Sequence, residues 1–102
     1  MILRILAEAE AEIDSARQYL NERSPGLGGR FLDELAEALD AIASRPLSFA
    51  KLETLAPDQP YHRALLATFH YAVVFDVLDS EIVVVAVAHA SREPNYWLGR
   101  PS

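Results

Sequence analysis

The residues best suited to chemistry gather in the last third of the chain. His89 ends a β-branched run, and Arg92, Tyr96, Trp97 and Arg100 follow it closely. Irregular segments that leave a strand end often carry sites, because a rigid scaffold positions them at the surface. Histidine can move a proton near neutral pH, and arginine can stabilise a charged phosphate transition state. The segment could therefore cleave a phosphodiester bond or bind a partner.

A candidate catalytic set consists of Arg63, His89 and Arg92. Arg63 begins another predicted strand and could clamp a phosphate while His89 transfers the proton. A structural interpretation stays open for each residue. His89 could be a structural histidine whose hydrogen bonds are satisfied within the protein, and Arg63 could instead pair with Glu53 or Glu81.

Tyr96, Trp97 and Arg100 are the candidate residues for binding a target or partner. The alternative is that the two aromatic side chains cover the sheet edge as apolar anchors. Arg100, like Arg92, could simply pair with a nearby acid.

We expect no metal and no cofactor. The chain has no cysteine, its three histidines show no ligand spacing, and its one Gly/Pro cluster, 24–29, follows a predicted helix. A phosphate-binding glycine loop would follow a strand instead.

Charge argues against general nucleic-acid binding. The net charge is −6, and residues 1–60 hold most of the excess acid. Lys51 is the only lysine, whereas nucleic-acid binders usually present a basic face. We expect Glu8, Glu10 and Glu12 to form a solvated face of the first helix, where the helix dipole favours negative charge.

The length of 102 residues predicts one domain, 1–102. The apolar start of the chain is too short for a signal peptide, and no run approaches a membrane span. We expect a cytoplasmic protein with no membrane association.

Hydrophobic periodicity predicts an α+β fold in the order β-α-α-β-β-β, with a two-helix hairpin on one face of a small, mostly antiparallel sheet. The expected elements are a strand over 1–6, helices over 7–23 and 29–44, and strands over 61–68, 69–78 and 81–90. The run 82–88 is apolar on both faces, although two helices can cover only one face. The chain's own tail, its 47–60 loop or a partner chain must cover the other.

The ordered pattern resembles the ParE-type toxins of the RelE/ParE superfamily, also known as plasmid stabilisation proteins. The front half of the resemblance rests on Ala9, Ile13, Tyr19-Leu20, Ser24-Pro25-Gly26-Leu27-Gly28, Phe31, Leu35, Ile42 and Pro46. The back half rests on Arg63, Phe69-His70-Tyr71, Val74-Phe75, Ala86-Val87-Ala88-His89, Arg92, Pro94, Tyr96-Trp97 and Arg100. The family commonly has proline where His70 stands.

The resemblance implies the toxin of a type II toxin–antitoxin system, a growth inhibitor neutralised by a cognate antitoxin. That antitoxin would be ParD-like or RelB-like and encoded by the adjacent gene, and DNA would be contacted only through it. ParE-like members poison DNA gyrase, whereas RelE-like members cut mRNA on the ribosome with several basic residues. The 24–28 spacer, the acidic balance and the single lysine favour the gyrase branch, and the His89/Arg92 pair keeps the ribonuclease branch open. A relic that only binds its antitoxin is a third interpretation.

Overall fold

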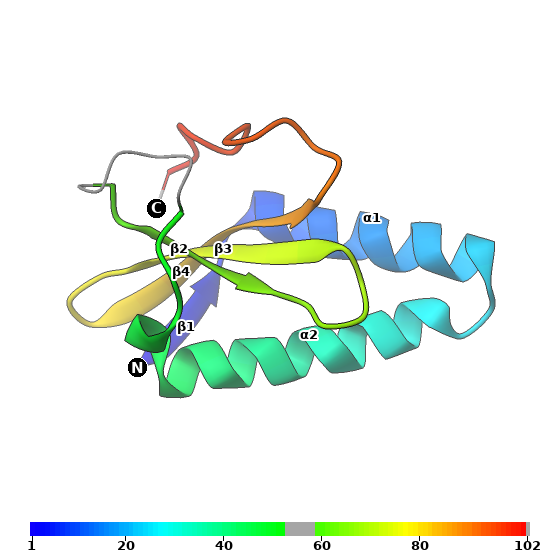
Figure 1. The fold of residues 1–102 in the computed structure, drawn as a ribbon, viewed down its shortest axis with the longest axis horizontal. Coiled ribbons are helices and arrows are strands. Elements are labelled where there is room, and N and C mark those ends of the chain that lie inside the picture. Colours follow the sequence, from blue (N-terminus) through cyan, green and yellow to red (C-terminus); the bar gives the residue numbers. More distant parts are fainter. Residues whose placement is uncertain (53–58, 102) are drawn as a thin grey trace.

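The computed structural model describes residues 1–52 and 59–101. Within them, secondary structure follows the predicted order (Figure 1). The elements are β1 (Ile2–Ile5), α1 (Ala7–Arg23), α2 (Leu27–Ser44), a 3₁₀ turn η1 (Pro46–Ser48), β2 (Tyr61–Leu65), β3 (Tyr71–Val77) and β4 (Glu81–His89). The α+β expectation is confirmed. The last two predicted strands differ from the observed ones by at most two residues at either end, while β2 stops three residues earlier than predicted.

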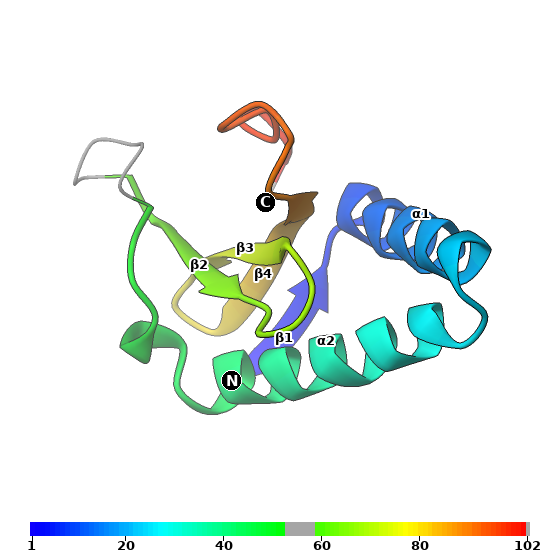
Figure 2. The ribbon, with the colours of Figure 1, turned by 45° about the vertical axis from the view of Figure 1, so that its right-hand side comes forward.

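The four strands form one sheet in the order β1-β4-β3-β2. β3 is antiparallel to both of its neighbours, and β1 is parallel to β4. The first strand therefore joins the sheet beside the last one, and α1 and α2 form the connection between β1 and the hairpin strands. Figure 2 shows the helical hairpin on one side of the sheet and the C-terminal segment on the other.

Two glycines shape the turn between the helices. Gly26 has a φ of 88°, a left-handed conformation that lets the chain re-enter a helix at Leu27, two residues before the predicted start. Gly28 lies against α1, where a Cβ atom would stand 2.5 Å from the backbone oxygen of Arg17. Its own N–H donates to the Asn21 side chain at 2.8 Å. The helices can approach this closely only because Gly28 has no side chain.

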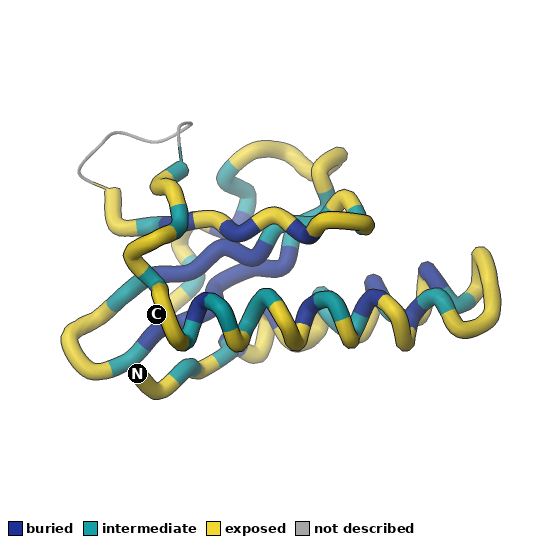
Figure 3. Tube along the Cα trace, turned by 60° about the horizontal axis from the view of Figure 1, so that its bottom comes forward, coloured by how far each residue is buried: buried dark blue, intermediate teal, exposed yellow. Residues whose placement is uncertain are grey.

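The core lies between the helices and the sheet, and Figure 3 shows buried positions along the central strands and at intervals along both helices. Phe31 of α2 is fully buried and packs against the rings of Phe69 and Tyr71. Leu35 and Ile42 continue the same buried stripe. Opposite them, Val73, Phe75 and Val84 are fully buried as well.

β4 buries an unbroken apolar run and contains a bulge. Val74 pairs with Ala86 but Phe75 pairs with Val84, so Val85 is an extra residue in β4. Every side chain from Ile82 to Val87 is buried within the chain itself. This strand is therefore not an exposed surface that needs a partner chain, and the C-terminal segment supplies much of its second cover.

The Gly28 contact leads to a matched prediction. Gly28→Ala should lower the free energy of unfolding by about 1–3 kcal/mol, because the new methyl group meets backbone and the helices must separate. Gly29→Ala, where nothing lies within 4 Å, should be neutral or raise stability by up to about 1 kcal/mol through helix propensity. Urea unfolding measures both, and equal effects would contradict the close approach.

Phe31→Ala should lower the free energy of unfolding by about 3–5 kcal/mol, because it removes a fully buried ring and its two aromatic neighbours cannot close the cavity. Thermal and urea denaturation test this. A variant that unfolds like the parent would show that the ring is not part of the core.

Candidate functional site: a cleft on the outer face of the sheet

A cleft of about 360 Å³ lies on the face of the sheet opposite the helices. Its floor is a row of three paired residues, because Leu65 of β2 lies opposite Ala72 of β3, which lies opposite Ala88 of β4. The two alanines are small and leave a hollow. Leu65 is 67% exposed, so a large apolar side chain borders this hollow.

The C-terminal segment forms one wall of the cleft. Trp97 is buried, with 4% of its surface exposed, and packs edge-on against Tyr61 with the ring centroids 4.7 Å apart. Asn95 has a φ of 63°, which turns the segment back toward the sheet. Trp97 therefore acts as an anchor of the wall, with little surface available to a partner.

All three candidate catalytic residues, Arg63, His89 and Arg92, line this one cleft. The His89 Nδ1 atom accepts a hydrogen bond from the Ser91 backbone N–H at 3.0 Å and lies 2.7 Å from the Ser91 hydroxyl. The ring also meets the edge of Tyr71. These contacts fix the orientation of the imidazole at the end of β4.

The two arginines of the C-terminal segment both lie over the Tyr96 ring. The Arg92 guanidinium carbon is 3.8 Å from the ring centroid, and that of Arg100 is 5.3 Å away. Cation–π contact of this kind holds a guanidinium in place and keeps its charge.

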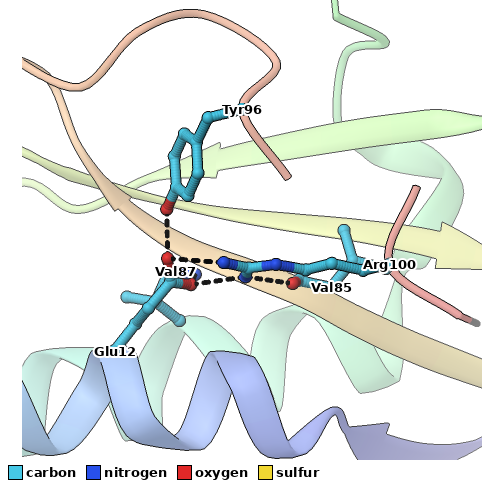
Figure 4. A network of polar contacts seen from close by, with 5 residues as sticks. All are labelled: Glu12, Val85, Val87, Tyr96 and Arg100. Carbon is cyan, nitrogen blue, oxygen red and sulfur yellow. Dashed lines mark hydrogen bonds and ion pairs between the residues drawn. The ribbon is translucent and has the colours of Figure 1, made fainter. Parts of the chain in front are cut away.

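A network centred on Glu12 of α1 holds the segment against the sheet (Figure 4). Arg100 donates to both carboxylate oxygens, from Nη1 at 2.9 Å and from Nη2 at 3.2 Å, and the Tyr96 hydroxyl donates to Oε2. The Val87 backbone N–H donates to Oε1 at 3.0 Å, and Arg100 Nη1 also reaches the Val85 carbonyl at 2.9 Å.

The network has a structural reason. β1 pairs with β4 only up to Val84, so among the described residues no strand pairs with this edge of β4 beyond Val84. Unpaired backbone groups near the core are costly unless something else bonds them. Glu12 accepts a hydrogen bond from the Val87 N–H, and Arg100 donates one to the Val85 carbonyl. These two side chains therefore make the hydrogen bonds that a neighbouring strand would otherwise make.

The ion pair is largely shielded from solvent, with 19% of the Arg100 side chain and 16% of the Glu12 side chain exposed. Burial and then the hydrogen bond to Glu12 raise the pKa of Tyr96 to about 12. The hydrogen bond from Arg100 to Glu12 raises the pKa of the guanidinium further. Both donors therefore keep their protons over the physiological pH range.

The expectation that the acids of the first helix form a solvated face is wrong for Glu12, which lies between Ala9 and Ala16 on the buried side of α1. Its spacing from these two alanines was the signal available in the sequence. Pairing of Arg63 with Glu81 is also wrong, because Glu81 bonds Arg4 at 2.9 Å. The other proposed partner, Glu53, lies outside the described residues. Arg100 does pair with an acid, although that acid comes from the first helix.

Other site classes receive no support in the part of the chain that the structure describes. Across 1–52 and 59–101, no cluster of three or more potential ligands could hold a metal ion. Neither of the two described α-helices is long and apolar enough to cross a membrane.

A helical hairpin on one face of a small mixed sheet, with the last segment folded over the other, is a fold shared with solved structures. One is described as the chromosomal ParDE TA system from P. aeruginosa; the TM-score is 0.75 over 87% of this chain and 95% of that chain, at 16% identity. Such low identity shows a common fold alone. No curated protein matches the sequence.

The family model for the ParE toxin of the type II toxin–antitoxin system parDE matches residues 3–94. The chain therefore belongs to the ParE toxin family, within the RelE/ParE superfamily. As a ParE-like toxin of a type II system it has a cognate antitoxin as its partner.

The raised pKa of Tyr96 predicts a specific pH dependence. Because the folded-state pKa exceeds the ordinary value of 10.0, the stability from the neutral hydroxyl is fully present below pH 10 and is lost as the pH rises toward 12. Tyr96→Phe should remove this component, so urea unfolding of the variant should show a shallower loss over that window. Tyrosinate absorbance of the parent should show a group with a pKa of about 12 that the variant lacks.

Trp97, the only tryptophan, reports independently on the same network. Glu12→Ala should red-shift its emission and increase quenching by acrylamide, because the segment loses its link to α1. Unchanged emission in a folded Glu12→Ala protein would show that Trp97 holds the segment without Glu12.

Proposed function

We propose that this toxin inhibits growth by acting on DNA gyrase in the cytoplasm and does not cut RNA. Its antitoxin, ParD-like or RelB-like and encoded by the adjacent gene, neutralises it, and contact with DNA runs only through that antitoxin. Membership of the ParE family supports the proposal. The observation that carries the proposal is that Arg92 and Arg100, the arginines of the C-terminal segment, contact groups of the protein itself.

Cleaving RNA needs a set of cations free to surround a phosphate, with a proton-transfer group beside them. Arg100 is committed to Glu12 and Val85, so Arg63 and Arg92 are the two arginines that line the cleft, and Arg92 is held in place by the Tyr96 ring. His89 is bound at Nδ1 by Ser91. With a net charge of −6 and a single lysine in the sequence, little remains to hold an RNA strand.

One observation favours the ribosome-dependent endoribonuclease as a second candidate. Arg63, His89 and Arg92 come from different segments and still line the same cleft. Cleavage would require the imidazole of His89 to reach a phosphate held by the two guanidinium groups, so this function predicts that His89 is essential.

His89→Ala should leave growth arrest intact, because the proposed mechanism uses no proton transfer. The parent, expressed alone, should induce DNA-damage signalling, and the purified toxin should inhibit supercoiling by gyrase. Coexpression with the product of the adjacent gene should restore growth and yield a copurifying complex.

Primer extension on mRNA from arrested cells tests whether the toxin cuts RNA. Ribosome-dependent cuts that vanish with His89→Ala would establish the ribonuclease and overturn the gyrase proposal. A parent that neither arrests growth nor inhibits gyrase would overturn both and leave a relic that only binds its antitoxin.

A further inference from the structure

We infer that the outer-face cleft is where the toxin captures its target, and that it takes a segment of the target protein in which carboxylates flank one bulky apolar side chain. This inference rests on the proposed function, since it names the surface through which gyrase would be recognised. It assigns the recognition to the sheet face and not to the helical hairpin.

The floor of the cleft calls for an apolar occupant. Leu65, Ala72 and Ala88 lie side by side across three strands, and neither alanine reaches far above the sheet. A single large apolar side chain would fill the hollow above the alanines and cover Leu65, which is otherwise 67% exposed. Removing this apolar surface from water favours binding.

The rim of the cleft calls for negative charge. The described residues that line it include Arg63, Arg92 and His70, with Glu93 as the one acid. His89 borders the cleft as well, but its ring contacts Tyr71, whose own ring packs against Phe31, so the imidazole lies on the helix side. The rim concentrates positive charge in one place on a chain whose net charge is −6 and whose other surfaces are mainly acidic. Complementary charge of this kind guides encounter and selects partners, so the segment that fits carries carboxylates beside its apolar side chain.

The wall of the cleft is already in place before binding. Glu12 fixes Tyr96 and Arg100 on either side of Trp97, and Trp97 packs on Tyr61. A wall held from both ends loses little conformational freedom when a ligand arrives, and this preorganisation favours affinity.

A protein segment fits these features better than a nucleic acid. Two arginines suffice for one or two carboxylates, whereas a nucleic-acid strand presents a phosphate at every nucleotide and needs a longer basic track. The apolar floor also offers no hydrogen-bonding groups for base edges.

The test fills the cleft without altering its charge. Ala88→Leu places a large side chain on the floor, and we expect it to weaken both binding to purified gyrase and inhibition of supercoiling about tenfold or more, the loss typical of a blocked hot spot. Ala36→Leu, an exposed position on α2, makes the same change away from the cleft and should alter neither by more than about twofold. Ala72→Leu repeats the test from β3 if Ala88→Leu fails to fold.

A second pair of variants tests the charge of the rim. Arg63→Glu should weaken gyrase binding and reduce its sensitivity to salt, whereas Arg30→Glu, exposed on α2, should do neither. Circular dichroism and melting temperature confirm that each variant is folded.

The outcomes separate the inference from the function on which it rests. A folded Ala88→Leu that inhibits gyrase as strongly as the parent would overturn the cleft as the capture site and leave the proposed function standing. Loss of antitoxin binding with intact gyrase inhibition would assign the cleft to the antitoxin instead, and loss of RNA cleavage alone would assign it to a nucleic acid. A parent that never inhibits gyrase would overturn the inference together with the proposed function.

Discussion

The carboxylate of Glu12 joins three parts of the molecule: the first helix, the bare edge of β4 and the C-terminal segment. The need for it arises from unequal strand lengths. β1 spans Ile2–Ile5 and β4 spans Glu81–His89, so β1 covers only the first half of its neighbour. The polar groups that remain on β4 must be bonded, and the network that bonds them also fixes the end of the chain.

The outer face of the sheet depends on that network. With the C-terminal segment held over β4, the chain covers its own apolar strand and leaves a bounded cleft between the segment and β2. Without it, the same residues would form an open apolar patch of the kind that invites nonspecific association. The network thus replaces an exposed apolar surface with a bounded cleft.

Acidic and basic residues have different roles in this toxin. The acidic residues of the helices give the chain its net charge of −6, while the few cations near the C-terminus are used locally, in an ion pair and in contacts with Tyr96. A chain organised in this way suits recognition of another protein more than capture of a phosphate backbone.

The sequence alone determined the elements and their order, because apolar periodicity, the Gly/Pro break after the first helix and the β-branched runs are local signals. It also placed Phe31, Leu35 and Ile42 on the core stripe, since residues at helical spacing share a face. Its resemblance to ParE-type toxins agrees with the family match over residues 3–94.

Only the tertiary structure decided what Glu12 and the cleft are. Glu12 and Arg100 lie at opposite ends of the chain, and no spacing rule relates residues so far apart. The row of Leu65, Ala72 and Ala88 depends on strand register, and the bulge at Val85 shifts that register in a way the pattern of β4 does not reveal. Long-range pairing is set by how whole elements pack, so the local sequence at each position leaves it undetermined.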